Sequence, residues 1–169
     1  MKSGNYGTIY CDMDGVLVDF LRGAEQALGH PFEAPTRDAK EKEMRKNHIE
    51  NIPHFWQTLP EMTGAQSLWS KIDKYGAHIL TAYAEWDKNS KSGKEIWVKK
   101  HLGLTDMSRF NAVLRHQKQD YAVSKNGKPN ILIDDYIKNI KEFEAAGGVG
   151  IHHVSAKVTI LKLKQLGFR

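Results

Sequence analysis

Short apolar runs recur along the chain, and each is bounded by Gly, Asn or Asp. The runs are rich in β-branched and aliphatic residues, which is typical of parallel strands buried on both faces. Four of them cover residues 8–11, 77–80, 131–133 and 149–151, and a weaker fifth covers residues 110–114. The pattern therefore predicts the strands of a buried sheet.

Stretches with apolar residues three and four positions apart separate these runs and predict helices. They cover residues 65–74, 91–101, 136–146 and 155–166. Strands and helices thus alternate, which favours an α/β fold with a three-layer, Rossmann-like parallel sheet. In such a sheet, ligands bind beyond the carboxyl ends of the strands.

One long stretch, residues 19–63, breaks the alternation because it carries no strand pattern. It contains helical patterns over residues 21–28 and 37–49, followed by His54, Phe55 and Trp56. We therefore predict a core domain of residues 1–18 and 64–169, with a small helical cap of residues 19–63 inserted after the first strand.

Length and composition fit a globular protein with a single core. The chain has 169 residues, of which 40% are hydrophobic and 27% charged, and this composition excludes disordered and fibrous proteins. No apolar run is long enough for a membrane span, and the first residues lack a signal peptide's apolar stretch. We expect a cytoplasmic protein without a membrane partner, and the single Cys11 agrees with a reducing compartment.

The formal net charge of +5 favours anionic partners. The chain nevertheless lacks the dense basic block or motif that usually accompanies nucleic-acid binding. Nucleic acid therefore stays open as a partner without being favoured, and a homodimer stays open as well.

Pairs of acidic residues follow two of the predicted strands. Asp12 and Asp14 come directly after residues 8–11, and Asp134 and Asp135 come directly after residues 131–133. These two strands should be neighbours in this topology, so the carboxylates should meet. Carboxylates that meet repel one another, and a hard divalent cation, most often Mg²⁺, offsets that repulsion.

Residues 12–16, with the sequence DMDGV, resemble motif I of the haloacid dehalogenase (HAD) superfamily of phosphotransferases. Thr81 resembles the motif II hydroxyl residue, and Lys94 resembles the motif III lysine, with Lys91 as its nearest rival. Asp134 and Asp135 resemble motif IV, so four motifs occur in the family's order.

Within this superfamily the chain is most similar to the 5′(3′)-deoxyribonucleotidases. Residues 12–20 resemble their first motif, extended to an aromatic, Phe20, that stacks on the base. Phe55 and Trp56 stand where the family's helical cap supplies aromatics to the nucleoside pocket, and residues 94–98 resemble its lysine-to-tryptophan helix. The resemblance implies a base pocket of Phe20, Phe55 and Trp56.

Two further features concern the phosphate site. Arg115 and Lys118 resemble basic residues near the family's phosphate site, although the loop of residues 119–130 is longer here. Ala82 stands where the family often has Ser, which leaves one phosphate contact unaccounted for. The resemblance thus implies a phosphate site at Thr81, Ala82, Lys94, Arg115 and Lys118.

The resemblance implies a Mg²⁺-dependent phosphomonoesterase that acts on a small ester, above all a (deoxy)nucleoside monophosphate. Asp12 would attack phosphorus and form a phosphoaspartyl intermediate, while Asp14 would act first as general acid and then as general base. Asp12, Asp134 and the backbone carbonyl of Asp14 would hold the metal, with Asp135 as an outer or alternate ligand.

Two alternatives stay open. The same chemistry could serve sugar phosphates or polynucleotide ends, although the aromatic cap favours a nucleotide. A protein of this fold could also be a non-catalytic module that binds nucleic acid or protein, but a module has no need of Asp12 and Asp14.

Other residues are expected to serve the structure. Cys11 should be a buried strand residue whose side chain points away from that of Asp12. Trp97 should belong to the core, and Asp19 should cap a helix or contact a loop.

Overall fold

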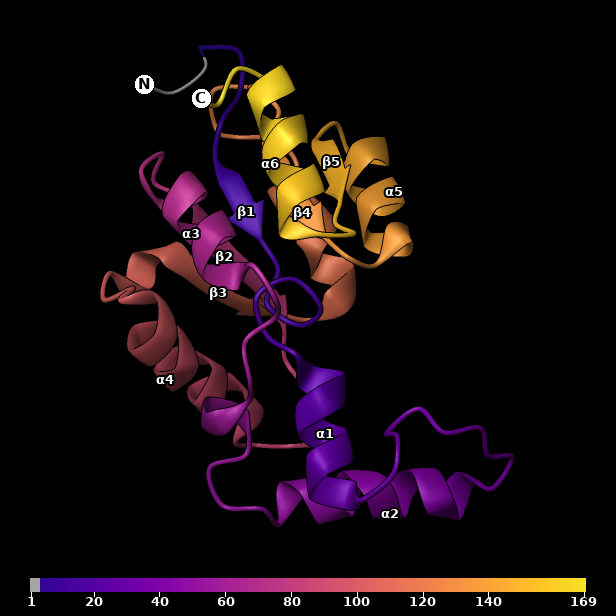
Figure 1. The fold of residues 1–169 in the computed structure, drawn as a ribbon. Helices are drawn as coiled ribbons and strands as arrows, with labels where there is room; N and C mark the ends of the chain where they lie inside the picture. The colour runs from indigo at the N-terminus through magenta and orange to yellow at the C-terminus, as the bar shows by residue number, and fades with distance from the viewer. Residues whose placement is uncertain (1–3) are drawn as a thin grey trace.

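The computed structural model describes residues 4–169, and its centre is a five-stranded parallel sheet (Figure 1). The strands lie in the order β3-β2-β1-β4-β5. Their bounds are β1 Ile9–Cys11, β2 His78–Ala82, β3 Phe110–Val113, β4 Ile131–Asp134 and β5 Val149–His152. The predicted α/β class with an open, Rossmann-like parallel sheet is confirmed, and the weaker fifth run forms the edge strand β3.

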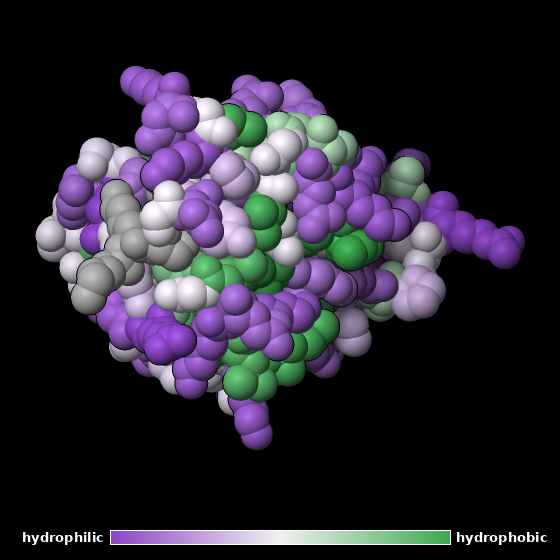
Figure 2. All heavy atoms as spheres, turned by 90° about the horizontal axis from the view of Figure 1, so that it is seen from above, coloured by the Kyte–Doolittle hydropathy of each residue, from purple (hydrophilic) through white to green (hydrophobic). Residues whose placement is uncertain are grey.

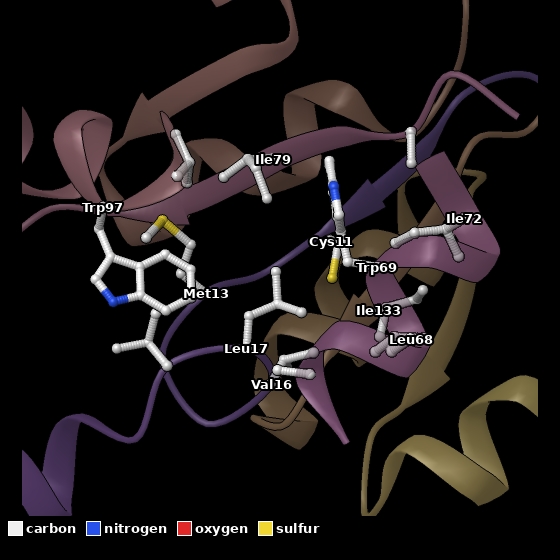
Figure 3. Close-up of a cluster of buried hydrophobic side chains, with 14 of the residues drawn as sticks. Cys11, Met13, Val16, Leu17, Leu68, Trp69, Ile72, Ile79, Trp97 and Ile133 are labelled. Atoms are coloured by element: carbon white, nitrogen blue, oxygen red, sulfur yellow. The ribbon is translucent and has the colours of Figure 1, made fainter. Parts of the chain in front are cut away.

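Helices cover both faces of the sheet. α3 (Ala65–Asp73), α4 (Ser90–Leu102) and α6 (Ala156–Gln165) share one buried cluster with Cys11, Ile79 and Ile133, part of which Figure 3 shows. α5 (Ile137–Ala145) and the 3-10 helix η3 (Arg115–Tyr121) cover the opposite face, where Leu80 and Leu132 pack. Consecutive strand residues thus pack on opposite faces, as a strand requires.

Two helices lie beyond the carboxyl end of the sheet, where Figure 1 draws them below the strands. They are α1 (Phe20–Leu28) and α2 (Ala39–Glu50), and they contact each other. The 3-10 helix η1 (Trp56–Thr58) follows and packs against α4, and a further one, η2 (Met107–Arg109), precedes β3. Both helices of the inserted stretch occur where the sequence predicts them.

The two segments that join this inserted stretch to the sheet lie side by side. The Asp19 backbone N–H donates to the Pro60 carbonyl at 2.8 Å, and the Met62 N–H donates to the Leu17 carbonyl at 2.9 Å. Val18 and Glu61 form an antiparallel bridge between these two hydrogen bonds. The chain therefore leaves the sheet and returns to it through one paired stem.

The residues expected to serve the structure do so. Cys11 and Trp97 are fully buried in the core. Asp19 caps α1, because its side chain accepts a hydrogen bond from the Arg22 backbone N–H at 3.1 Å. The Trp97 indole N–H also donates to the Leu59 carbonyl at 2.9 Å, which ties α4 to the segment that follows η1.

The opposite end of the molecule, which carries both termini, shows polar residues around smaller apolar areas (Figure 2). Such a mixture is ordinary for a protein surface. Among residues 4–169, no helix has the length and apolar character that crossing a membrane requires. The chemistry-bearing residues gather at the carboxyl end of the sheet.

Candidate active site

We call Asp12, Asp134, Asp135 and Lys118 the floor of the candidate site. They lie where β1 and β4 end side by side. Cys11 pairs with Ile133 in the parallel register, and the Asp12 N–H donates to the Ile133 carbonyl at 2.9 Å. Asp12 is 6% exposed, and Asp134 is fully buried. The two acidic pairs therefore meet, as the strand order predicted.

Lys118 lies between Asp12 and Asp134 and is itself buried. Its Nζ is 3.0 Å from Asp12 Oδ1 and 2.7 Å from Asp134 Oδ2. Asp134 also accepts hydrogen bonds from Asn139 Nδ2 at 3.0 Å and from the Tyr136 N–H at 2.9 Å. Burial alone would lower the pKa of Lys118, but the charges of Asp12 and Asp134 raise it above its ordinary value. The lysine therefore remains a cation on the floor.

The negative charge of the floor carboxylates, when all are ionised, exceeds the positive charge of Lys118 beside them. Asp12, Asp134 and Asp135 each offer one oxygen within 4.8 Å of the others. Desolvation raises the pKa of Asp12 to about 7, and desolvation with the charge of Asp134 raises that of Asp135 to about 6. A cluster of hard oxygen ligands whose negative charge is this unfavourable fits a divalent cation such as Mg²⁺.

Gly15 makes room for this cluster. It has a φ of +80°, and a Cβ at this position would lie 2.1 Å from Asp135 Oδ2. A side chain at position 15 would therefore be strained and would also push Asp135 away. The glycine of the DMDGV motif is thus required by the approach of the β1 and β4 loops.

A second lysine, Lys94 on α4, serves the other carboxylate of the β1 loop. Its Nζ lies 2.5 Å from Asp14 Oδ2 and 3.1 Å from Thr81 Oγ1, and the residue is 1% exposed. Lys91 instead lies over the Tyr83 ring, with its Nζ 4.6 Å from the ring centroid. Of the two lysines, Lys94 is the one that joins the site.

The Asp14 side chain differs from that of Asp12 in its exposure. It is 35% exposed, and its Oδ1 is a buried atom without a hydrogen-bond partner among residues 4–169. One oxygen is thus held by Lys94, and the other has unused hydrogen-bonding capacity. That arrangement suits a group that exchanges a proton with a ligand or with water.

Two adjoining cavities open on these residues. One, of about 410 Å³, is lined by Asp12, Asp14, Ala82, Lys118 and Asp135, among others. The second, of about 260 Å³, shares Asp14, Phe20 and Ala82 with the first and adds a set of mostly aromatic residues. That set is Phe32, Trp56, Tyr83 and Trp86, together with Lys46 and Ala84.

The rings of the second cavity hold one another in place. The Phe20 and Trp56 rings stack at a centroid distance of 5.5 Å and an angle of 18°. The Trp56 indole N–H donates to Asp87 Oδ2 at 2.6 Å, and Lys94 Nζ lies 5.5 Å from the Trp56 ring centroid. We call Phe20, Phe32, Trp56, Tyr83 and Trp86 the aromatic wall. Lys94 lies between this wall and the floor, because it contacts Asp14 and lies beside Trp56.

Apart from the buried Asp134, four predicted residues line neither of these two cavities. Lys94 contacts Asp14 and donates a hydrogen bond to Thr81, whereas Phe55 and Arg115 lie elsewhere. Phe55 packs edge-on against Phe20 and Trp56 but lines a different cavity of about 490 Å³, which none of the floor carboxylates borders. Arg115 donates to Asn139 Oδ1 at 3.0 Å and to Glu142 Oε2 at 2.8 Å, so its guanidinium faces α5. It lines neither the 410 Å³ cavity nor the 260 Å³ cavity.

Sequence reasoning missed several wall residues. Tyr83 and Trp86 directly follow β2, and the rule that ligands bind beyond strand ends could have found them. Phe32 and Lys46 stand in the inserted stretch, where no periodicity separates wall from surface. Asp87 gave no signal beyond its place in a polar segment.

Comparisons with known proteins agree with the motifs. No family model matches the chain. It is 28% identical over 132 residues to a Vibrio phage KVP40 protein named "Putative 5'(3')-deoxyribonucleotidase", covering 78% of this chain and 67% of that protein.

Solved structures of the HAD superfamily share the architecture. A hydrolase of this superfamily from Ehrlichia chaffeensis superposes with a TM-score of 0.50 at 12% identity, over 94% of this chain and 96% of that one. A structure named "Putative beta-phosphoglucomutase" from Bacteroides vulgatus has a TM-score of 0.51 at 15% identity, over 95% and 82% of the two chains. The chain therefore has the fold of the haloacid dehalogenase-type hydrolases, as its motifs predict.

Proposed function

We propose that the chain is a phosphomonoesterase of the haloacid dehalogenase type, acting on (deoxy)nucleoside monophosphates. The observation that carries this proposal is the pair of aspartates after β1, each beside its own buried lysine. Lys118 faces Asp12, and Lys94 faces Asp14. The two carboxylates thus have different surroundings, which is the arrangement that separate roles in one reaction need.

Asp12 is the nucleophile in this proposal. Its oxygen forms a bond to phosphorus while the bond from phosphorus to the ester oxygen breaks, which leaves a phosphoaspartyl group on Asp12. The Lys118 ammonium, 3.0 Å from Asp12 Oδ1, favours the ionised carboxylate that this attack requires. Lys118 also restrains the side chain, because it is anchored on Asp134.

Asp14 handles the proton. It gives a proton to the departing ester oxygen, and it takes a proton from the water that then releases phosphate from Asp12. The partner-free Oδ1 serves this exchange, and Lys94 holds Oδ2. Lys94 and Thr81 also offer a positive charge and a hydroxyl to the phosphoryl oxygens.

The metal in this proposal is Mg²⁺, held by Asp12, Asp134 and the backbone carbonyl of Asp14, with Asp135 as an alternate ligand. When bound, it would neutralise negative charge on the phosphoryl oxygens. The crowding of Asp12, Asp134 and Asp135 supports this assignment, because Lys118 alone leaves the pKa of Asp12 and Asp135 raised.

The aromatic wall supports a nucleotide as substrate. Phe20, Phe32, Trp56 and Trp86 border the cavity that also contains Asp14, and such rings bind a flat base by stacking. The name of the phage relative agrees with this substrate class. Phe55 supports the wall from behind, through its contacts with Phe20 and Trp56.

Phosphate release from a panel of esters tests the proposal. The panel holds ribo- and deoxyribonucleoside 5′- and 3′-monophosphates, sugar phosphates and phosphorylated oligonucleotides, each with Mg²⁺ and with a chelator. We expect release from nucleoside monophosphates that needs Mg²⁺ and falls by about 10⁴-fold or more in Asp12→Asn.

Asp120→Asn is the matched control, because Asp120 is an exposed carboxylate on η3 outside both cavities. It should retain full activity. Release from sugar phosphates alone would overturn the substrate. Absence of release from every ester would overturn the enzyme assignment.

A further inference from the structure

A further cavity, of about 340 Å³, extends the site toward α2. It shares Phe32 and Lys46 with the 260 Å³ cavity. That cavity in turn shares Asp14, Phe20 and Ala82 with the cavity over the floor. The three cavities therefore adjoin in a row, which we call the path, from Asp12 at one end to α2 and the loop before it at the other.

Positive charge gathers at the cap end of this path. Lys46 is the only cation among the described residues that line the aromatic cavity. Lys42 and Arg45 join it around the 340 Å³ cavity, which the carboxylate of Glu33 also lines. Within residues 4–169, neither Lys42 nor Lys46 takes part in an ion pair.

Arg45 holds the loop at this end of the path in place against α2. It is 5% exposed and donates to the Phe32 and Ala34 carbonyls at 2.8 Å each, which fixes the loop opposite α2. An ion pair, at 2.7 Å, joins it to Glu41, yet its Nε is buried without a hydrogen-bond partner in the part of the chain that the structure describes. A buried cation with an unsatisfied N–H favours an anionic ligand nearby.

We propose that this end of the path binds a second phosphate of the substrate. The inference rests on the proposed function and narrows it to nucleotides that carry phosphate on two sugar oxygens. The phosphate to be cleaved lies at Asp12, the nucleoside lies along the aromatic wall, and the other phosphate reaches Lys46 and Lys42. A substrate with only one phosphate leaves these cations unused.

Two sources have this chemistry. One is a free nucleoside 3′,5′-bisphosphate. The other is the phosphorylated end of an oligonucleotide, in which the next phosphodiester supplies the second charge.

Steady-state kinetics on three substrates test the inference: a deoxynucleoside 5′-monophosphate, the matching 3′,5′-bisphosphate and a 5′-phosphorylated dinucleotide. The wild-type protein should have a higher kcat/KM for at least one doubly charged substrate than for the monophosphate. Lys46→Ala should lower this preference about tenfold, the size expected for one lost charge contact of about 1.4 kcal/mol. Lys40→Ala is the control, because Lys40 lies on the same helix outside the cavities, and it should keep the preference.

Every outcome is informative. A preference for the dinucleotide identifies an oligonucleotide end, and a preference for the bisphosphate identifies the free nucleotide. Release from the monophosphate without any preference overturns the inference and leaves the proposed function intact. An equal loss on all three substrates in Lys46→Ala shows a merely structural lysine and also overturns the inference. No release from any substrate overturns the proposed function and, with it, this inference.

Discussion

The floor and the wall of the site are built from different interactions. On the floor, Asp12, Lys118 and Asp134 form charged contacts of 2.7–3.0 Å across β1, η3 and β4. In the wall, Phe20 and Trp56 come from the inserted stretch and stack, and Asp87 accepts a hydrogen bond from the tryptophan. Substitutions that remove charge, and the binding of a metal ion, should therefore affect the floor most. Substitutions that change the shape or support of an aromatic side chain should affect the wall most.

Removal of the floor's cation should have the largest effect. Lys118→Met leaves Asp12 and Asp134 buried without their counter-charge, so the free energy of unfolding should fall by about 3–5 kcal/mol. Urea unfolding followed by circular dichroism measures this loss. Lys125→Met, which changes an exposed lysine, should leave the midpoint in place. Equal midpoints for the two variants would mean that charge does not hold the floor.

Lys94 belongs to both regions, because it contacts Asp14 and lies beside Trp56. Lys94→Met should lower kcat by about 10²–10³-fold, the usual cost of losing a group that stabilises transition-state charge. Lys91→Met should retain kcat, since Lys91 packs on Tyr83. If Lys91→Met showed the greater loss, the assignment of the two lysines would be reversed.

The anchor of the wall should have an intermediate effect. Asp87→Ala leaves the Trp56 indole N–H without its buried acceptor, which costs about 1–3 kcal/mol in the free energy of unfolding. We expect KM for nucleotides to rise more than kcat falls, because the floor is untouched. Glu85→Ala changes an exposed carboxylate two residues away and serves as the control. Trp56→Phe lacks the N–H, so adding Asp87→Ala to it should cost less than Asp87→Ala alone costs.

Addition of Mg²⁺ should have the smallest effect on the free energy of unfolding. The size of this effect should depend on pH, because the carboxylates of the floor titrate near neutral pH and the aromatic side chains of the wall do not. Burial raises the pKa of Asp12 and Asp135, so these groups contribute stability below their ordinary pKa and lose it as pH rises through about 6 to 7. Metal binding needs the ionised carboxylates, so Mg²⁺ should stabilise the protein more at pH 8 than at pH 5.

At ten times its Kd, Mg²⁺ should add about 1.4 kcal/mol. Thermal unfolding with and without the ion measures this gain. Asp135→Asn should reduce it, and Asp87→Ala should not. A gain of the same size in Asp135→Asn would move the metal away from the floor.

Sequence reasoning was effective for the floor because strand periodicity fixes where each strand ends. The carboxyl ends of β1 and β4 place Asp12 and Asp134 together, and β2 places Thr81 beside Lys94. The chain order of the motifs thus determines most of the floor. The direction of the Arg115 side chain was not predictable, because its contact with Glu142 depends on how η3 packs against α5.

The wall was predicted only in part. Phe20 and Trp56 carried a family resemblance, whereas Phe32 and Lys46 reach the site through packing within the inserted stretch. The irregular segment that holds Phe32 is fixed by Arg45, which lies 13 residues further along the chain. The pattern of neighbouring residues in the sequence does not predict a contact between positions this far apart.

The paired stem at Asp19 and Pro60 has a consequence for how such a protein can change. Because the chain leaves and re-enters the sheet at adjacent points, an insert of almost any length can be spliced there without altering the strand order. The stem is therefore a fixed attachment point for the inserted stretch. Exchange of the insert would change residues that border the 260 Å³ cavity, while Asp12 and Asp134 stay where the sheet places them.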